Sequence, residues 1–379
     1  MLARFQFVDP QTSEYKRRGS QALVYGGMTF LRVGIAADAA TTLARAVTIA
    51  IRYAAIRQQF ADETRHPRLN KQVFSTTAWC SIVFSLSSAQ RTGFSLLPKA
   101  CAVSMSHGTT ISVEGIETAR RACGGHGYSH YSGIGHLYSE MLPSVTYEGD
   151  NYMLTKQVAR ALIKGAKAKS AMFADYNPSA KFDFAKDVDI IKAYGHRVAF
   201  QTFQIIRLRD TGSTWNALLI PFWRLCTAYA QFIICSSRRP LPPTRPYDVD
   251  NYASEFADAQ AVPAALRDGV SRQKAIADLL SKIRPHAVNL MDGWAFSDLV
   301  LNSSLGRSDG KAYESMFRRA AANPVNTLTF DPVRNRVCSS RADRRWQSCK
   351  RPYLLKTSDM KGLSDCQMAM RVTCQYDNV

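Results

Sequence analysis

The sequence predicts an all-α fold of two helical bundle domains, and three observations support this prediction. Apolar residues recur at the three- and four-residue spacing of amphipathic helices over long stretches. Between residues 20 and 170, no alternation of apolar and polar residues, the pattern of a half-buried strand, competes with this spacing. At 379 residues and 46% hydrophobic content, the chain is long enough to bury a core in each of two domains.

Four parts are expected in order along the chain. They are an extended initial segment at 1–20, a first helical domain at 21–170, a second helical domain at 185–330 and a poorly ordered tail at 331–379. The initial segment is polar and rich in turn-forming residues, and the tail has weak periodicity. Within the second domain, the prolines of residues 236–246 preclude a regular helix and predict an exposed connection.

The first domain is expected to contain four long helical segments. Their ranges are 35–56, 73–97, 109–123 and 151–169. In the first segment Leu43 and Val47 fall on one face, and in the last Leu154, Val158 and Leu162 recur at four-residue intervals. Alanine is the strongest helix former, so the alanine-rich first segment indicates a helix, and its small side chains would let neighbouring helices approach closely.

The charge balance favours an anionic partner but does not identify one. The formal net charge is +19, yet the basic residues are spread along the chain without a recognition motif, so no nucleic-acid partner is expected. The nine cysteines include no Cys-x-x-Cys pair, which argues against a zinc site or disulfide framework and fits a reducing compartment. His126, His130 and His136 lack a carboxylate or cysteine at ligand spacing, so no metal site is expected.

The most membrane-like stretch of the chain is residues 217–235. It carries Pro221, Arg224 and Gln231, which favour a buried helix over a membrane span. The first residues of the chain also lack the basic-then-apolar pattern of a secretory signal. We therefore expect a soluble protein without a membrane span.

Three local features could carry chemistry, and each has a purely structural alternative. The glycine-rich turn at 123–128 could bring backbone amides close to a phosphate, although taken alone it is better explained as a helix terminus followed by a tight loop. Arg57 could clamp a pyrophosphate or simply be a surface charge at a helix end. Glu148 could be a general base whose pKa is raised by burial, or an acid favoured by the dipole of the following helix.

The order of these features along one chain carries a family resemblance. The blocks "RAVTIAIRYAAIRQQF", "GIETARRACGGHGYSHYSG" and "PSVTYEGDNYMLTKQVARALIK" follow one another at a separation that closely resembles the carboxyl-terminal half of the peroxisomal acyl-CoA oxidases. These enzymes belong with the acyl-CoA dehydrogenases in a flavin-dependent superfamily. A fourth block at 289–317 looks like the additional helical domain of the oxidases. The resemblance covers roughly residues 20–326.

The resemblance implies a reaction and a catalytic residue. Glu148 matches the family's catalytic base, which removes the α-proton of a fatty acyl-CoA while a hydride leaves the β-carbon for FAD. The product would be a trans-2-enoyl-CoA, and molecular oxygen would reoxidise the flavin and form hydrogen peroxide. The backbone amide of Glu148 would help to stabilise the developing enolate. Asp150 is expected to turn away from this pocket.

The resemblance also implies a cofactor site. Arg57, Gln59 and Phe60 resemble the element that contacts the adenine dinucleotide part of FAD across a subunit interface, which implies a homodimer. The family's usual Arg-Arg-Gln-Phe appears here with one arginine fewer. The loop that receives the pyrophosphate would be formed by Gly124, Gly125 and Gly127. Glu148 is expected to point into a dry cleft near this loop.

The chain departs from the family pattern at both ends. Its sequence starts after the amino-terminal helical and β-barrel-like domains of whole acyl-CoA oxidases, so a fragment or truncated form is expected. It ends without the Ser-Lys-Leu type of peroxisomal address, so a peroxisomal location follows from the resemblance and not from the visible terminus. The alternative hypothesis is a non-catalytic helical dimerisation module derived from an oxidase.

Overall fold

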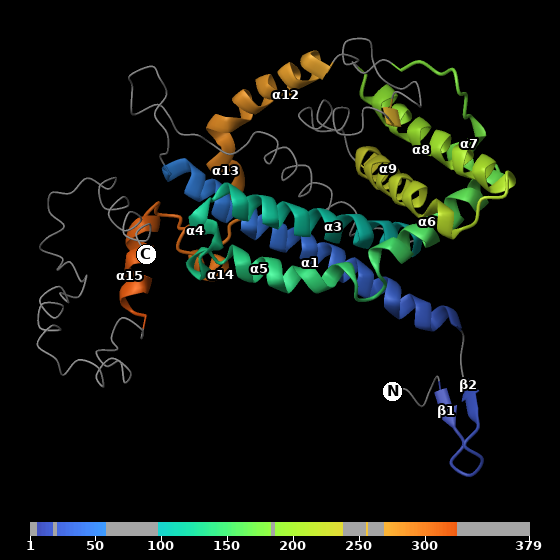
Figure 1. Cartoon of the computed structure of the whole chain (residues 1–379), viewed down its shortest axis with the longest axis horizontal. Coiled ribbons are helices and arrows are strands. Elements are labelled where there is room, and N and C mark those ends of the chain that lie inside the picture. Colours follow the sequence, from blue (N-terminus) through green and yellow to red (C-terminus); the bar gives the residue numbers. More distant parts are fainter. Residues whose placement is uncertain are drawn as a thin grey trace, which may run out of the picture. The chain divides into compact units, whose positions relative to one another are not determined.

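A computed structural model of the chain describes residues 6–17, 21–57, 98–182, 186–237, 255–256 and 269–323. Within these residues the fold is helical apart from one small hairpin, which confirms the predicted all-α class (Figure 1). The expected helix at 73–97, most of the connection at 236–246 and the tail at 331–379 lie outside the described residues. The chain divides into two compact units, Met1–Ala312 and Tyr313–Val379.

The hairpin lies in the segment that was expected to be merely extended. Strands β1 (Gln6–Val8) and β2 (Tyr15–Arg17) pair in antiparallel register, with Phe7 opposite Lys16. The turn between them is closed by Asp9, whose side chain accepts hydrogen bonds from the amides of Gln11 and Thr12. This local bonding by an aspartate is a common way to build a turn.

The longer helices of the first unit include the expected segments at 35–56, 109–123 and 151–169, the first two of them extended at their starts. They are α1 (Gln21–Ile56), α3 (Pro98–Ala122), α6 (Asn151–Lys167), α8 (Asp187–Asp210), α9 (Leu219–Ser237) and α12 (Gly269–Ile283). Helix α3 begins at Pro98, eleven residues before the expected start at 109. Proline suits the first position of a helix, because the amide it lacks would have no partner there. Helix α1 likewise begins fourteen residues before the expected start at 35.

Short helices fill the connections. They are α4 (Gly125–Tyr128), η2 (His130–Ser132), α5 (Ile134–Met141), η3 (Leu142–Val145), α7 (Ala171–Ala174), η4 (Asn216–Leu218), η6 (Arg284–His286), α13 (Ala287–Asp292) and α14 (Asp298–Leu301). Helix α15 (Ala312–Ala321) falls almost wholly in the second unit. The compact series from α4 to η3 leads the chain from the end of α3 to the start of α6.

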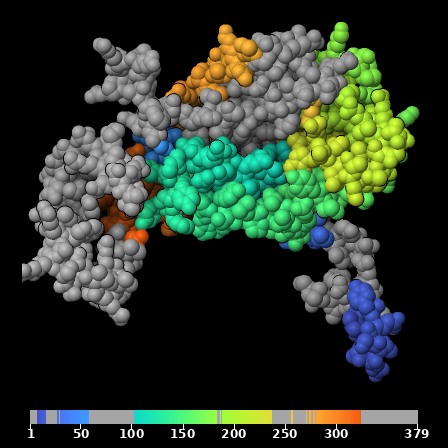
Figure 2. Space-filling view, viewed as in Figure 1, coloured from blue at the N-terminus to red at the C-terminus, as the bar shows by residue number. Residues whose placement is uncertain are grey.

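Helix α1 packs against α3 along much of its length and also contacts α5 and α13. In Figure 1 it runs between α3 and α5, and in Figure 2 these helices largely cover it. Small residues bring α1 and α3 together: Ser112 donates a hydrogen bond to the Ala39 carbonyl at 2.8 Å, and Gly115 lies against Leu43. The expected close packing of the alanine-rich helix is therefore confirmed.

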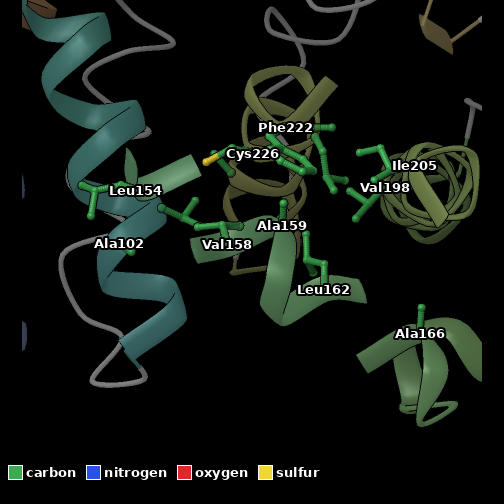
Figure 3. Close-up of a cluster of buried hydrophobic side chains, with 14 of the residues drawn as sticks. Ala102, Leu154, Val158, Ala159, Leu162, Ala166, Val198, Ile205, Phe222 and Cys226 are labelled. Atoms are coloured by element: carbon green, nitrogen blue, oxygen red, sulfur yellow. The ribbon is translucent and has the colours of Figure 1, made fainter. Parts of the chain in front are cut away.

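One hydrophobic core is shared by α3, α6, α8 and α9. The predicted face of α6, namely Leu154, Val158 and Leu162, is buried in it together with Phe222 of α9 and Val198 of α8 (Figure 3). Packing of α6 against both α8 and α9 therefore joins helices that the sequence assigned to two separate domains.

Two helical stretches are long and apolar enough to cross a membrane by length and composition. They are Phe30–Ile56 and Asn216–Ser236. In the most apolar 18-residue window of each stretch, 67% and 50% of the residues, respectively, are buried. The core helix of a soluble protein meets the same criterion, so this property is weak evidence for a span.

The shared core also buries a histidine. His107 on α3 is 8% exposed, and its Nε2 has no hydrogen-bond partner among the residues that the structure describes. Burial, assisted by the positive charge of Arg197, lowers the pKa of His107 from 6.5 to about 4. The imidazole is therefore neutral in the folded protein at physiological pH.

This shift predicts a loss of stability on mild acidification. His107 binds a proton near pH 6.5 in the unfolded chain and only near pH 4 in the folded chain. The contribution of neutral His107 to the unfolding free energy is therefore complete above pH 6.5 and is lost as the pH falls towards 4. Urea denaturation at pH 7.5 and 5.5 measures this loss. Between these two pH values, the unfolding free energy of His107→Gln should fall by about 1 kcal/mol less than that of the wild type. Equal losses in the two proteins would contradict the assignment.

Candidate functional site

The segment around Glu148 forms a tight turn between η3 and α6. The amides of Thr146 and Tyr147 both donate to the Pro143 carbonyl, at 3.0 and 3.1 Å. Glu148 then has a φ of 57° and Gly149 a φ of 118°. A left-handed conformation is unusual for a glutamate and costs on the order of 1–3 kcal/mol, so other contacts must hold it.

Arg32 of α1 supplies those contacts. Its Nε and Nη2 donate to the Glu148 carbonyl oxygen at 3.0 and 2.9 Å, and the side chain is 8% exposed. Gly149 leaves room for this pairing, because a Cβ there would lie 3.3 Å from Arg32 Nη2 and 3.1 Å from Leu154 Cδ2. Sequence reasoning missed Arg32. The available signal was an arginine within an apolar stretch of a helix, whose donors need an acceptor once buried.

The residues after the turn fix it to α3. Asp150 caps α6, accepting a hydrogen bond from the Tyr152 amide at 2.9 Å, so its carboxylate is engaged by the helix. Asn151 is buried and donates to the Ser106 carbonyl at 3.1 Å and to the Thr109 hydroxyl at 2.9 Å. The Glu148 turn is therefore held by α1 on one side and α3 on the other. Glu148 itself is half-buried, and no described residue pairs with its carboxylate.

A second group of predicted residues gathers where α1 and α3 end. Arg57 donates through Nη1 to the Cys123 carbonyl, and its guanidinium lies against Gly124 so closely that a Cβ there would be 2.6 Å from Nη1. Gly124 has a φ of 60°, which favours glycine. The Tyr53 hydroxyl bonds to His126 Nδ1 beneath this loop. The structure therefore brings Arg57 and the glycine turn of one chain together.

The chemistry of this loop suits an anion. Burial raises the pKa of the Cys123 thiol to about 12, against the opposing charge of Arg57, so the thiol is neutral. Burial, and then the charge of Arg57, lowers the pKa of His126. The guanidinium of Arg57 has no carboxylate partner among the described residues. Gly125 faces open space, and a phosphate could approach its backbone. These residues fit the diphosphate of FAD, while Gln59 and Phe60 lie outside the described residues.

The two groups lie on separate stretches of the chain. Arg32, which holds the Glu148 turn, and Ile56, next to Arg57, are 24 residues apart on α1, roughly 36 Å at the helical rise. Figure 1 accordingly shows α4 and the start of α6 towards opposite ends of α3. The expectation that Glu148 lies near the glycine loop of the same chain is not met, because one straight helix separates them.

No metal-binding cluster of three or more His, Cys, Asp or Glu side chains occurs among the residues with described positions. Of the three histidines considered from the sequence, His136 forms an ion pair with Glu140 at 3.4 Å when protonated, and His126 bonds to Tyr53. Cys123, Cys226 and Cys235 are buried and form no disulfide.

The glycine loop gives a matched pair of test substitutions. A Cβ on Gly127 would lie 2.0 Å from the Arg120 carbonyl oxygen, whereas nothing lies within 4 Å of a Cβ on Gly125. Gly127→Ala should therefore lower the unfolding free energy by at least about 1–3 kcal/mol, because backbone must move. Gly125→Ala should change it by less than about 0.5 kcal/mol. Chemical denaturation measures both, and equal effects would show that the loop geometry is wrong.

Two family models match the chain. The model described as "Acyl-CoA oxidase, C-alpha1 domain" matches residues 25–163, which include both groups of candidate site residues. The model described as "Acyl-CoA oxidase" matches residues 247–338. Together they cover more than half of the chain.

Similar proteins give the same result. The putative peroxisomal acyl-coenzyme A oxidase 1.2 of Arabidopsis thaliana is 29% identical over 86% of this chain and 58% of its own length. The peroxisomal acyl-coenzyme A oxidase 1 of Rattus norvegicus is 28% identical over 86% of this chain and 59% of its own length. The chain therefore spans somewhat less than two thirds of these relatives.

Solved structures share the fold. Arabidopsis thaliana acyl-CoA oxidase 1 has a TM-score of 0.75 at 24% identity, covering 91% of this chain and 61% of that protein. Acyl-CoA oxidase-1 of Caenorhabditis elegans, solved with FAD and ATP, has a TM-score of 0.74 at 24% identity over 91% of this chain and 59% of its own. With the two family models in agreement along the sequence, these findings show that the chain belongs to the acyl-CoA oxidase family.

Proposed function

We propose that this chain carries the catalytic base and part of the cofactor cradle of an FAD-dependent acyl-CoA oxidase. The reaction would convert a fatty acyl-CoA and molecular oxygen to a trans-2-enoyl-CoA and hydrogen peroxide, the first step of fatty acid β-oxidation. The observation that carries the proposal is the Glu148 turn, in which a buried arginine holds a glutamate in a left-handed conformation. Backbone strain of this kind is concentrated at functional sites.

Glu148 would act on the α-carbon of the thioester. An α-proton is a very weak acid, so the base must be oriented and the carbonyl oxygen must accept hydrogen bonds as negative charge develops. Arg32 fixes the backbone from which the Glu148 carboxylate projects, and the Asp150 carboxylate is engaged as the cap of α6. The Glu148 amide, which has no acceptor among the described residues, would donate to the thioester oxygen. Bound FAD would supply the acceptor for the hydride from the β-carbon.

Arg57 and the glycine turn would bind the FAD diphosphate. The guanidinium has donors beyond the one used by the Cys123 carbonyl, and the open surface at Gly125 lets backbone amides approach an anion. Gly124 and Gly127 would keep the loop compact. Gln59 and Phe60 would contact the adenine dinucleotide part.

The separation of the two groups supports a homodimer. A cofactor reaching the Glu148 turn of one chain would meet the Arg57 loop of a second chain, since α1 keeps the two groups of one chain roughly 36 Å apart along its axis. The relatives are named peroxisomal, so we assign this chain to the peroxisome, with fatty acyl-CoA and molecular oxygen as its other partners.

Substitution of the base tests the proposal directly. The purified chain should show flavin absorbance after incubation with FAD and should release peroxide with palmitoyl-CoA. Glu148→Gln should lower kcat by at least about a thousandfold while flavin binding is unchanged, because only the proton acceptor is lost. Peroxide formation that survives Glu148→Gln would refute the role of Glu148.

A wild-type chain that binds no flavin and forms no peroxide would refute catalysis by this chain. In that case a stable dimer in light scattering would favour the non-catalytic dimerisation module. A monomer without flavin would refute both proposals.

Arg32 is a positioning residue, and its substitution should change kcat more than KM. Arg32→Met removes both donors to the Glu148 carbonyl, and a displaced base should lower kcat on the order of a hundredfold. Arg32→Lys, which keeps one donor and the charge, should recover part of the loss. Steady-state peroxide assays measure both constants, with thermal unfolding as a control for folding. An unchanged kcat in Arg32→Met would contradict this role.

A further inference from the structure

A pocket of about 160 Å³ lies between α3, α6 and α9, and neither Glu148 nor the Arg57 loop lines it. Its volume corresponds to roughly five water molecules. It is lined by Ser106, His107, Thr110, Ile111, Glu114, Thr155, Trp223, Cys226 and Thr227. Figure 3 shows Cys226 on the side of α9 that faces α3. None of these residues belongs to the proposed base or the proposed FAD loop.

Most hydroxyl groups in the pocket are already used. Ser106 donates to the Asn151 carbonyl at 3.3 Å, Thr110 to the Ser106 carbonyl at 2.8 Å, and Thr155 to the Tyr152 carbonyl at 2.7 Å. Among the described residues, the polar groups left without a partner are Nε2 of His107, the Thr227 hydroxyl and the Glu114 carboxylate. A buried imidazole nitrogen without a partner is costly, so a ligand that bonds to the ring would recover that loss.

The charges around the pocket select a ligand without net charge. The exposed Glu114 lies at the rim and forms no ion pair with a described residue, so an anion would be repelled there. Arg197 is close enough to the buried His107 to affect its protonation, so a cation at the floor would also be disfavoured. A neutral, polar group is compatible with both charges when its positive end lies at Glu114 and its negative end lies towards His107.

The apolar walls select the rest of the ligand. Ile111 and the ring of Trp223 line the pocket, and Tyr152 packs on Trp223 with ring centroids 4.7 Å apart. A flat apolar group would pack well against this indole.

We propose that the pocket between α3, α6 and α9 binds a small uncharged molecule with an amide group, held by His107, Thr227 and Glu114 and packed on Trp223. The amide carbonyl accepts from His107 or Thr227, and the amide N–H groups donate to Glu114. Because Ser106 and Thr110 also bond to Asn151, the pocket adjoins the anchor of the Glu148 turn. The binding itself does not depend on oxidase activity.

The test compares three ligands of similar size on the full chain by isothermal titration calorimetry. Benzamide is neutral, benzoate is an anion and benzylamine is a cation. Benzamide should bind saturably, with a dissociation constant at least about tenfold below those of the other two. Thr227→Val and Glu114→Gln should each weaken benzamide binding several-fold, while Thr41→Val, an exposed threonine on α1, should leave it unchanged.

Three outcomes would overturn the proposal. They are no binding of benzamide, equally tight binding of benzoate or benzylamine, and unchanged benzamide binding in both pocket variants. Glu114 is exposed, so Glu114→Gln should fold even if Thr227→Val does not, and circular dichroism verifies this. Since no flavin or peroxide is measured, failure here is distinct from failure of the proposed oxidase function.

Discussion

The hydrogen bonds from Arg32 to the Glu148 carbonyl link the interior of the protein to its candidate chemistry. A charge-assisted pair of this kind contributes about 1.5–3 kcal/mol, which is comparable with the cost of a left-handed glutamate. The hydrogen bonds offset the backbone cost only while α1 holds Arg32 opposite the Glu148 carbonyl. The packing of α1 on α3, and of Asn151 on α3, therefore determines where the Glu148 backbone lies.

Helix α1 has a second role at its other end, where Arg57 contacts the glycine turn after α3. Because α1 is a continuous helix, the separation between the two groups is fixed by the number of residues between them and not by flexible loops. A site assembled from both groups thus depends on two chains meeting in one geometry, which is the physical basis for the proposed homodimer.

The sequence predicted the features that depend on local pattern. The face formed by Leu154, Val158 and Leu162 is buried as expected, because helical periodicity is visible within one segment. The start of α3 at Pro98 and the role of Arg32 were not predicted. Proline is compatible with either the end or the beginning of a helix, and the acceptor for Arg32 lies 116 residues away, so both depend on which segments meet in space.

The apolar character of α1 follows from its packing against several other helices of the first unit. Its second buried arginine, Arg52, is 8% exposed and donates to Asp292 at 2.8 and 3.0 Å and to the Gly306 carbonyl at 2.9 Å. Each buried guanidinium therefore has acceptors supplied by other parts of the same unit. Such contacts stabilise charges in a protein interior, whereas hydrocarbon lipid offers no acceptor to an arginine on an exposed face. The membrane-like composition of α1 thus reflects burial on several sides, with the arginines placed where the structure can pair them.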